Sequence, residues 1–302
     1  MTKTSSQSAD KPPVQVVRVC KYHGLGNDFI LLSEQCANTI HDLKDFIIQV
    51  CDRHTGIGAD GLIVARTHPF FMEYYNQDGS TAPMCGNGLR CLCAFLNDEH
   101  LIAGLDRIEV ETLAGLKTAE VISRSPFLVR VQMGKAIDDP KAIDARADHP
   151  IHDYPLQIDG KTIPIDSFFM STTHTIVYDL NAMGDIEHPG KEICEHPLFE
   201  KQTNVDFVHV LDRSHIEVQT YERGCGVTLA CGTGVCASAL DAFRRGLVDR
   251  SVDVRLKRGW LHIDIEEDES VIMSGPAEKI LDGNFFYTPS RMKTADPLLG
   301  TL

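Results

Sequence analysis

Hydrophobic and polar positions along the chain form short blocks, most of them long enough for one strand. Blocks rich in β-branched or aromatic residues predict strands. They lie at Val14 to Val19, Phe29 to Leu32, Leu62 to Ala65 and Phe70 to Tyr75. Between the first two, residues 21–28 have turn chemistry throughout, so we expect a loop there. The segment from Asp42 to Cys51 differs, because its apolar residues recur at i, i+3, i+4 and i+7 and predict an amphipathic helix.

Two later segments are apolar around almost the whole circumference of a helix. The first follows Cys85 and carries leucine, cysteine and phenylalanine, and the second follows Cys231 and is made of smaller side chains. Arg244, Arg245 and Gly246 end the second segment, with positive charge in the last turn and glycine at the stop. A helix that is apolar on every side is a buried one. We therefore expect two central helices, each wrapped by sheet.

The two parts of the chain repeat the same order of features. Tyr75 precedes Cys85 by ten residues, and Tyr221 precedes Cys231 by ten. After each cysteine helix come a strand, a glycine turn and another strand. An internal echo of this kind predicts a duplicated α/β fold, of the α+β type, with two pseudo-symmetric halves. Placing the two helix starts against each other at the pseudo-twofold axis would build one site from both halves.

The sequence also indicates where the halves begin and end. We predict a flexible tail at 1–13, an N-terminal half at 14–133, a C-terminal half at 134–276, and a segment at 277–302 that returns to the N-terminal half. The tail has neither the apolar stretch of a secretory signal nor the Arg-rich amphipathic character of a transit peptide.

Composition narrows the classes of function. A chain of 302 residues with 43% hydrophobic and 24% charged residues is typical of a soluble globular protein. Its formal net charge of −14 argues against a nucleic-acid or anionic-membrane partner, and no apolar run has the length of a membrane span. The ten cysteines include no Cys-x-x-Cys pair, so we expect reduced thiols, no zinc site and a cytoplasmic location.

The candidate chemistry lies in two matching segments, Met84 to Gly88 and Ala230 to Gly234, each a cysteine followed by Gly-x-Gly. A glycine-rich turn that opens a helix leaves unpaired backbone N–H groups, which favour an anion. A single cysteine in this context is more often structural. Two in matching context favour catalysis, because a thiolate and a thiol on opposite faces of a carbon can remove and return a proton. We expect the helix start to lower the thiol pKa into the physiological range. The predicted reaction is stereoinversion at an acidic carbon.

Glu222 and Arg223 are adjacent and alternate faces if they lie on a strand. Arg223 is suited to bind a carboxylate in a bidentate manner, and Glu222 to hold an ammonium or tune a thiol. A solvated strand end is an equally good interpretation of this pair. His174 alone is a weak signal among thirteen histidines. The sequence has no spacing typical of a metal site, and its glycine runs lack the βαβ context of a dinucleotide site.

Several motifs together resemble the diaminopimelate epimerases, which invert one α-carbon of a bis-amino acid without a cofactor. They are HGLGNDF (23–29), DRHTGIGADG (52–61), NQDGSTAPMCGNGLR (76–90), NVDF (204–207), YERGCGVTLACGTGVCA (221–237) and SGPAE (274–278). The resemblance covers most of the chain from Val17 to about Gly283. It implies two halves, each a β-barrel-like, mostly antiparallel sheet around a central helix, with the active site in the cleft between them. It also implies a homodimer.

The resemblance further implies roles for individual residues. Cys85 and Cys231 would be the acid/base pair, with His174 and Glu222 assisting near the reacting centre. By motif position, the substrate would be bound by Asn27, Asn76, Asn204, Glu222 and Arg223. The reacting carboxylate would be held by backbone N–H groups of Gly86, Asn87, Gly232 and Thr233.

One departure bears on specificity. The family usually has Gly-Asn-Pro-His where this chain has Ser171-Thr172-Thr173-His174, so Thr172 replaces a substrate-binding Asn. Threonine keeps a hydroxyl but loses the two-sided hydrogen bonding of an amide. A cofactor-independent racemase of another amino acid is therefore an alternative. A non-catalytic thiol sensor or binding module is a third.

Overall fold

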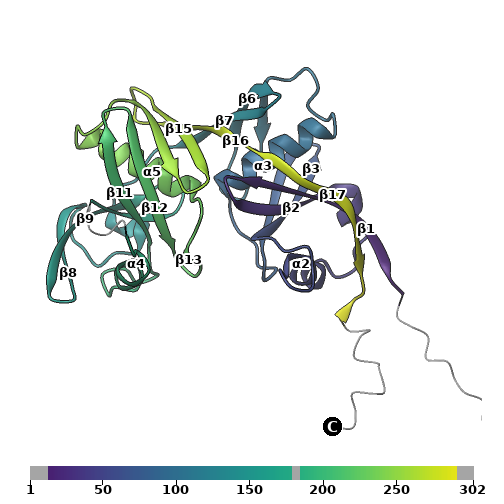
Figure 1. Ribbon diagram of the computed structural model, residues 1–302, viewed down its shortest axis with the longest axis horizontal. Helices are drawn as coiled ribbons and strands as arrows, with labels where there is room; N and C mark the ends of the chain where they lie inside the picture. The colour runs from purple at the N-terminus through teal and green to yellow at the C-terminus, as the bar shows by residue number, and fades with distance from the viewer. Residues whose placement is uncertain (1–12, 179–183, 291–302) are drawn as a thin grey trace, which may run out of the picture.

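The computed structural model describes residues 13–178 and 184–290, which form two lobes (Figure 1). The first lobe contains, in chain order, β1 (Gln15–Gly24), β2 (Asn27–Ser33), α1 (Glu34–Ala37), α2 (Leu43–Cys51), β3 (Gly61–Thr67), β4 (Phe70–Asn76), α3 (Gly86–Asp98), β5 (Arg107–Val110), β6 (Lys117–Arg124) and β7 (Phe127–Gly134). The chain continues with the short 3-10 helix η1 (Pro140–Ile143), β8 (Ile151–Ile158), β9 (Lys161–Phe169), β10 (Thr173–Val177), α4 (Glu187–Cys194), β11 (Asn204–Asp212), β12 (His215–Glu222), β13 (Gly226–Val227), α5 (Gly232–Arg244), β14 (Ser251–Leu256), β15 (Gly259–Ile265), β16 (Val271–Pro276) and β17 (Glu278–Tyr287).

The strands form two sheets. A five-stranded sheet has the order β17-β1-β2-β3-β4, and a twelve-stranded sheet runs from β5 to β8 through β7, β16 and β15. Within the described residues, only the pairs β2–β3, β10–β11 and β12–β14 are parallel. The sheet pairing between β7 and β16 continues the hydrogen-bonded ladder from one lobe to the other. The predicted fold class, two sheet-rich α/β halves with mostly antiparallel strands, is confirmed.

Each lobe is built around one buried helix. Helix α3 contacts β1, β2, β3, β7 and β17, and α5 contacts β10, β11, β12, β14, β15 and β16. Every residue of α3 from Gly86 to Leu96 is buried, and the same holds for α5 from Gly232 to Ala242 with the exception of Thr233. The prediction of two central helices wrapped by sheet is confirmed. Because both helices are held on all sides, their N-termini are rigid places on which to build a site.

The loop expected at residues 21–28 is wrong. Strand β1 continues to Gly24 and β2 begins at Asn27, so only Leu25 and Gly26 form the turn. Their φ angles of 57° and 99° are those of a tight two-residue hairpin turn. Polar residues of this segment bond to other side chains of the fold. The Tyr22 hydroxyl donates to Asp98 at 2.7 Å, and the Lys21 ammonium forms an ion pair with Asp28 at 2.8 Å.

The C-terminal strand β17 pairs with β1 along almost its whole length, from Gln15–Tyr287 to His23–Glu278. Strand β16 crosses between the lobes immediately before it (Figure 1). The division of the chain at residues 133/134 and 276/277 stays a prediction. The predicted N-terminal tail lies, apart from Pro13, outside the described residues.

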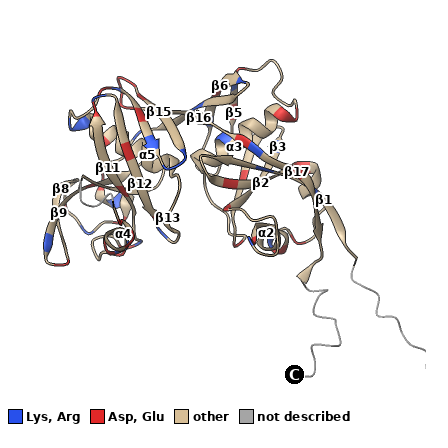
Figure 2. Cartoon of the chain, in the orientation of Figure 1, with Lys and Arg blue, Asp and Glu red and all other residues tan. Residues whose placement is uncertain are grey.

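Charged side chains of both signs are scattered over both lobes (Figure 2). Many form surface ion pairs, such as Arg18 with Glu99 and Asp282. In the described part of the chain, no helix is long and apolar enough to cross a membrane.

Candidate active site

Cys85 and Cys231 occupy equivalent positions, as the N-cap residues of α3 and α5. The Cys85 Sγ accepts a hydrogen bond from the Gly88 N–H at 3.4 Å. The Cys231 Sγ lies 3.4 Å from the Thr233 hydroxyl oxygen. Both thiols therefore sit at the positive end of a helix, as the sequence predicts.

The two helix starts meet. Asn87 in the first turn of α3 donates from Nδ2 to the carbonyl of Ala230, just before Cys231, at 3.1 Å. A Cβ on Gly232 would lie 3.1 Å from Asn87 Oδ1 and 3.4 Å from the Met273 sulfur, and a Cβ on Gly86 would lie 2.9 Å from Cε of the same methionine. A side chain at either position would have to displace Met273, or Asn87 of the other helix start, so the two glycines allow the helix starts to pack closely.

Burial sets the protonation of both thiols. It raises the pKa of Cys85 to about 11, and the N–H groups of Gly88 and Asn87 oppose this only in part. Burial also raises the pKa of Cys231 well above its usual value, and the carboxyl groups of Glu222 and Asp206 add to the effect. The expectation that the helix start brings the thiol pKa into the physiological range is wrong for the free protein. The helix N–H groups act in the expected direction, but desolvation is larger.

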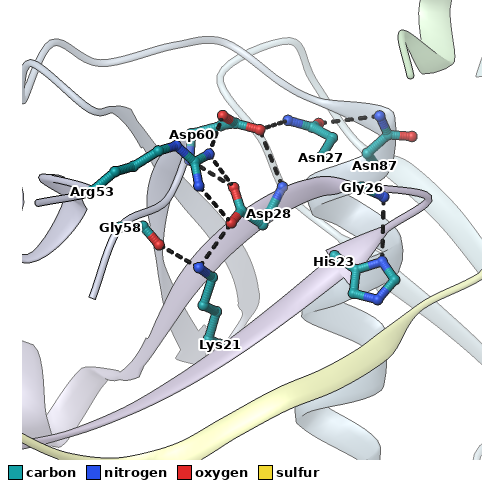
Figure 3. Close-up of polar contacts among 9 residues, drawn as sticks. All are labelled: Lys21, His23, Gly26, Asn27, Asp28, Arg53, Gly58, Asp60 and Asn87. Carbon is teal, nitrogen blue, oxygen red and sulfur yellow. Dashed lines mark hydrogen bonds and ion pairs between the residues drawn. The ribbon is translucent and has the colours of Figure 1, made fainter. Parts of the chain in front are cut away.

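Asn27 connects the Cys85 side of the site to a charged network (Figure 3). Its Oδ1 accepts from Asn87 Nδ2 at 3.1 Å and from the Cys85 thiol at 3.7 Å, while its Nδ2 donates to Asp60 at 2.7 Å. Since an amide has a distinct donor end and acceptor end, the Asp60 carboxylate fixes which end faces the thiol. The carbonyl end is the one presented to Cys85.

Asp60 is held in turn by Arg53, whose guanidinium pairs with Asp60 and Asp28 at 2.7 Å each. Asp28 is buried, which acts to raise its pKa, but its contacts with Arg53 and Lys21 lower the pKa below the usual value. Figure 3 shows these side chains in a continuous chain from Arg53 to Asn27 and Asn87. The glycine-rich segment 52–61 therefore serves to orient Asn27.

On the Cys231 side, His174 of β10 is fully buried beside Asp206 of β11. Its Nδ1 lies 2.7 Å from Asp206 Oδ2, and its Nε2 lies 2.9 Å from the Thr233 hydroxyl. The Thr220 hydroxyl donates to the other Asp206 oxygen at 2.7 Å. His174, one of thirteen histidines in the sequence, is thus connected to Cys231 through a single hydroxyl group.

Glu222 lies at the end of β12, where its Oε1 accepts from the Thr228 hydroxyl at 2.6 Å. Burial raises the pKa of this carboxyl group. Its charge also raises the pKa of both thiols, so it lies close enough to influence Cys85 and Cys231 alike. In the described residues, Glu222 and Arg223 form no ion pair with each other. Glu222 is the last residue of β12 and Arg223 lies in the turn that follows, so the alternation expected of two neighbours on a strand does not occur.

Asn204 at the start of β11 positions the backbone of Arg223. Its Nδ2 donates to the Thr173 carbonyl at 3.0 Å, and its Oδ1 accepts from the Arg223 N–H at 3.0 Å. The Arg223 side chain is exposed and donates from Nη1 to the Lys201 carbonyl at 2.8 Å. Arg223 therefore lies in the turn directly after β12, next to Glu222 in the chain, with an exposed side chain.

Two predicted residues are not linked to this network by any hydrogen bond in the described part of the chain. Asn76 donates from Nδ2 to the Ser80 hydroxyl at 3.0 Å within its own turn. Thr172 lies in the turn before β10, where its carbonyl accepts from the Met170 N–H at 2.7 Å. Their proposed roles in substrate binding stay predictions.

Three residues of the site were missed by sequence reasoning: Asp60, Asp206 and Arg90. Asp60 and Asp206 belong to motifs that the sequence singles out, but their partners lie on other elements. Arg90, on α3, is fully buried; its Nε donates to the Pro276 carbonyl at 3.2 Å and its Nη2 has no partner in the described residues. Its positive charge acts to lower the pKa of Cys85.

Comparison with known proteins gives matches along most of the chain. The sequence profile of the family described as diaminopimelate epimerase matches residues 19–137 and 172–280. A relative from Nostoc sp. named diaminopimelate epimerase 1 is 38% identical over 277 residues, covering 88% of this chain and 99% of the relative. A diaminopimelate epimerase from Halothermothrix orenii is also 38% identical, with 87% of this chain and 95% of the relative covered.

Solved structures with the same fold are more distant in sequence. A hydroxyproline epimerase from Agrobacterium vitis has a TM-score of 0.64 at 13% identity and covers 94% of this chain and 95% of its own. A phenazine biosynthesis protein of the PhzF family from Bacillus anthracis has a TM-score of 0.64 at 12% identity, over 90% of this chain and 100% of its own. At these identities the likeness concerns the fold alone.

Proposed function

The chain belongs to the diaminopimelate epimerase family and is an isomerase, and we propose that it inverts one α-carbon of diaminopimelate with the thiols of Cys85 and Cys231. The reaction converts the LL isomer to the meso isomer in lysine and peptidoglycan-precursor biosynthesis. The observation that carries the mechanism is the meeting of two helix N-termini, each capped by a cysteine and joined by the Asn87–Ala230 hydrogen bond. A carbon bound between them would have one sulfur on each face.

The proton transfers follow from this placement. One cysteine, as thiolate, takes the α-proton, and the other, as thiol, gives a proton to the opposite face of the same carbon. One S–H bond forms and one breaks, so the two thiols exchange roles with every turnover. The electron pair left by the departing proton spreads onto the carboxylate, and we assign its stabilisation to the backbone N–H groups of Gly86, Asn87, Gly232 and Thr233. Because this stabilisation comes from the helix starts, the reaction needs no cofactor to act as an electron sink.

Binding of the substrate has to supply the thiolate. In the free protein burial holds both thiols protonated at neutral pH, since the pKa of each is raised. The α-ammonium group of the substrate adds positive charge beside the thiols, and we assign Glu222 on β12 to hold that group. The ammonium offsets the negative charges of Glu222 and Asp206, which raise the thiol pKa in its absence.

The far end of the substrate sets specificity. Asn27, Asn76, Asn204 and Arg223 are the polar groups that we assign to it, with Arg223 suited to a carboxylate. Thr172 replaces the amide usual in the family and offers one hydroxyl instead. A racemase or epimerase of another amino acid is the alternative that this change favours.

The test is epimerisation by the purified protein of a panel of amino acids: LL-diaminopimelate, proline, hydroxyproline and glutamate. We expect turnover of diaminopimelate and loss of at least about a thousandfold in Cys85→Ser and Cys231→Ser, since a serine hydroxyl is a far weaker acid than a thiol. Turnover of a different panel member alone would move the assignment to that substrate. Activity unchanged in both serine variants would contradict the two-thiol mechanism.

We also propose that the protein is a cytoplasmic homodimer that binds neither nucleic acid nor membranes. The dimer is supported by an exposed apolar patch formed by Val14 just before β1, Val16 on β1 and Phe286 on the edge strand β17. Val16 and Phe286 are direct cross-strand neighbours, and Phe286 is 69% exposed. Covering this patch would remove apolar surface from water and protect an open sheet edge.

Light scattering on a sizing column tests the dimer. We expect a dimeric mass for the natural chain and a monomeric mass for Phe286→Glu, because a charge in the patch opposes its burial. Trp260→Glu is the matched control, since Trp260 is also exposed but lies on β15 of the other lobe. A monomeric natural chain, or a dimer that survives Phe286→Glu, would contradict the proposal.

A further inference from the structure

A row of polar side chains crosses three neighbouring strands of the second lobe. His215 at the start of β12 is paired directly with Asp253 on β14, and Asp253 is paired directly with His262 on β15. Directly opposed residues of paired strands point to the same face of a sheet. Val252 and Val254, the neighbours of Asp253 along β14, are buried. The row therefore lies on the face of the sheet opposite to the core.

Both imidazoles of the row have one ring nitrogen beside Asp253. His262 Nδ1 lies 2.7 Å from one oxygen of this carboxylate, and His215 Nε2 lies 3.9 Å from the other. Neighbouring strands are about 4.8 Å apart, so the two rings stand on either side of the shorter carboxylate. Because an imidazole extends farther from the backbone than a carboxylate, both rings can bind one ion placed above Asp253.

The outer nitrogen of each ring is held by a second carboxylate. His215 Nδ1 lies 2.9 Å from Asp212, and His262 Nε2 lies 3.2 Å from Asp264. An ionised carboxylate only accepts hydrogen bonds, so each outer nitrogen carries a ring proton. In metal sites, a carboxylate behind the imidazole fixes the orientation of the ring and makes its inner nitrogen the ligand.

The carboxylates of the row are largely free of basic partners. Within the described residues, neither Asp212 nor Asp253 forms an ion pair with a lysine or an arginine. Asp264 has a contact with Arg130 of β7 at 3.7 Å. The three carboxylates therefore favour a cation between the two rings.

A different cluster of potential ligands lies in the first lobe. Cys20, Glu99 and Asp282 bring their ligand atoms within 4.8 Å of one another. Arg18 donates to Glu99 and to Asp282 at 2.8–3.0 Å, so a guanidinium already occupies both carboxylates. The row in the second lobe is therefore the better candidate for a metal site.

We propose that His215, Asp253 and His262 bind one divalent ion of the zinc class, with Asp212 and Asp264 orienting the two imidazoles. Imidazole nitrogen and carboxylate oxygen are ligands that such ions take. The three ligand residues are partly exposed, so an ion from solvent can reach them. The ion enters between His262 and Asp253 in place of their direct hydrogen bond, and it joins β12, β14 and β15. This site does not depend on the proposed function.

The single tryptophan of the chain reports on this site, because the ring centroid of Trp260 lies 5.8 Å from that of His215. Ni²⁺ quenches a nearby indole through its open d shell, whereas Zn²⁺ has a filled d shell and does not. We expect NiCl₂, added to the full chain without a histidine tag, to quench the fluorescence of Trp260 with one-to-one saturation. Excess ZnCl₂ should restore the fluorescence by displacing the nickel.

Substitutions at the exposed face test which residues hold the ion. Asp253→Asn and His262→Gln each remove a ligand and should weaken Ni²⁺ binding by at least about a hundredfold, while Asp212→Asn removes an orienting carboxylate and should weaken it by about tenfold. His188→Gln is the matched control. It removes another exposed histidine of the second lobe, one that pairs with Asp159 at 2.9 Å, and should leave the affinity unchanged.

Two outcomes would overturn the site. One is quenching that rises linearly with NiCl₂ up to about 1 mM, since this is the behaviour of ions that collide with an exposed indole without binding. The other is an affinity in Asp253→Asn and His262→Gln within about twofold of the natural chain, because the nickel would then be held by other residues. Turnover is not measured, so the result is separate from that of the amino-acid panel.

Discussion

At Cys85 and Cys231, burial and the helix N-terminus act on the pKa of the thiol in opposite directions. The N–H groups of Gly88 and Asn87 stabilise the anion at Cys85, yet burial still raises its pKa to about 11. At Cys231, the hydroxyl of Thr233 and the N–H of Gly234 work against burial and two nearby carboxyl groups. Both thiols of the free protein are thus neutral. One of them has to ionise before it can remove a proton from the substrate.

This balance predicts the pH dependence of activity. Since each thiol pKa is raised, the fraction of free enzyme with one thiolate grows as the pH rises toward the folded-state values. We expect kcat/KM for diaminopimelate, which reports the free enzyme and free substrate, to increase steadily between pH 7 and pH 9. Initial rates in buffers of constant ionic strength measure it. A flat profile from pH 6 to pH 9 would mean that the thiolate is already formed in the free enzyme.

Sequence reasoning found the residues that carry their own local signal. Cys85 and Cys231 stand in duplicated Gly-x-Gly segments, and periodicity alone placed them at the starts of buried helices. Asp206 and Asp60 carry no such signal, because each depends on a partner far away in the chain. Asp206 bonds to His174, 32 residues away, and Asp60 bonds to Asn27, 33 residues away. The predicted lowering of the thiol pKa is wrong for a similar reason. The helix start is visible in the sequence, but the burial that raises the pKa depends on packing by the whole fold.

At the scale of elements, α3 and α5 are similar in length and N-cap residue but differ in the side chains that pack against them. Both have thirteen residues and a cysteine N-cap, and both are enclosed by strands. Their third residues, Gly88 and Gly234, differ in what lies against them: methyl groups in the first lobe and the Asp206 carboxylate in the second. The duplication therefore supplies the symmetric placement of two thiols, and the packing around each helix makes the two thiols unequal.

Alanine at these two glycines should separate the two environments. In Gly88→Ala the new methyl group meets the flexible end of Met72, so we expect a change in unfolding free energy below about 1 kcal/mol, with the better helix propensity of alanine in its favour. In Gly234→Ala it overlaps the hydrogen-bonded Asp206 carboxylate, and we expect a loss of about 2–3 kcal/mol. Urea unfolding followed by circular dichroism measures both. Equal losses in the two variants would contradict the difference in packing.

Hydrophobic periodicity is sufficient to predict the helices and most strand positions, because the pattern of a buried helix or an alternating strand is visible within a few residues. It failed at residues 21–28, where polar side chains suggested a loop. Tyr22 and Lys21 are polar because they bond to Asp98 and Asp28 inside the fold, and only the two residues of the hairpin turn lie outside the strands. The pairing of β17 with β1 joins residues more than 250 positions apart and has no local signal of its own.

At the scale of the whole molecule, Cys85 and Cys231 come from different lobes and lie where the two lobes touch. Besides the Asn87–Ala230 hydrogen bond, the β1–β2 turn meets the second lobe, where a Cβ on Gly26 would lie 2.9 Å from Leu229 and 3.3 Å from Arg258. The lobes are joined by β16 and by the segment after β7 (Figure 1). Closure of the lobes over a substrate would exclude water and strengthen every electrostatic interaction in the site.

This arrangement predicts a redox sensitivity. Thiols that approach one carbon from two sides come close enough after closure to form a disulfide, so mild oxidation should inactivate the protein and dithiothreitol should restore it. Peptide mapping should find the Cys85–Cys231 link. The experiment uses a Cys225→Ser background, since Cys225 is an exposed cysteine that could link two molecules. Oxidation that leaves activity intact, or a loss that dithiothreitol does not reverse, would count against the facing geometry.

The most direct test of two-thiol stereoinversion is the position of deuterium after the first turnovers of LL-diaminopimelate in D2O. Each thiol exchanges with solvent before binding, so the acid delivers deuterium to the product while the base returns only the hydrogen it removed. Two-thiol stereoinversion predicts meso product carrying one deuterium at the inverted carbon, and recovered LL substrate without label. Product that retains its original hydrogen, or substrate labelled as fast as product, would contradict it, because a single base would then serve both faces of the carbon.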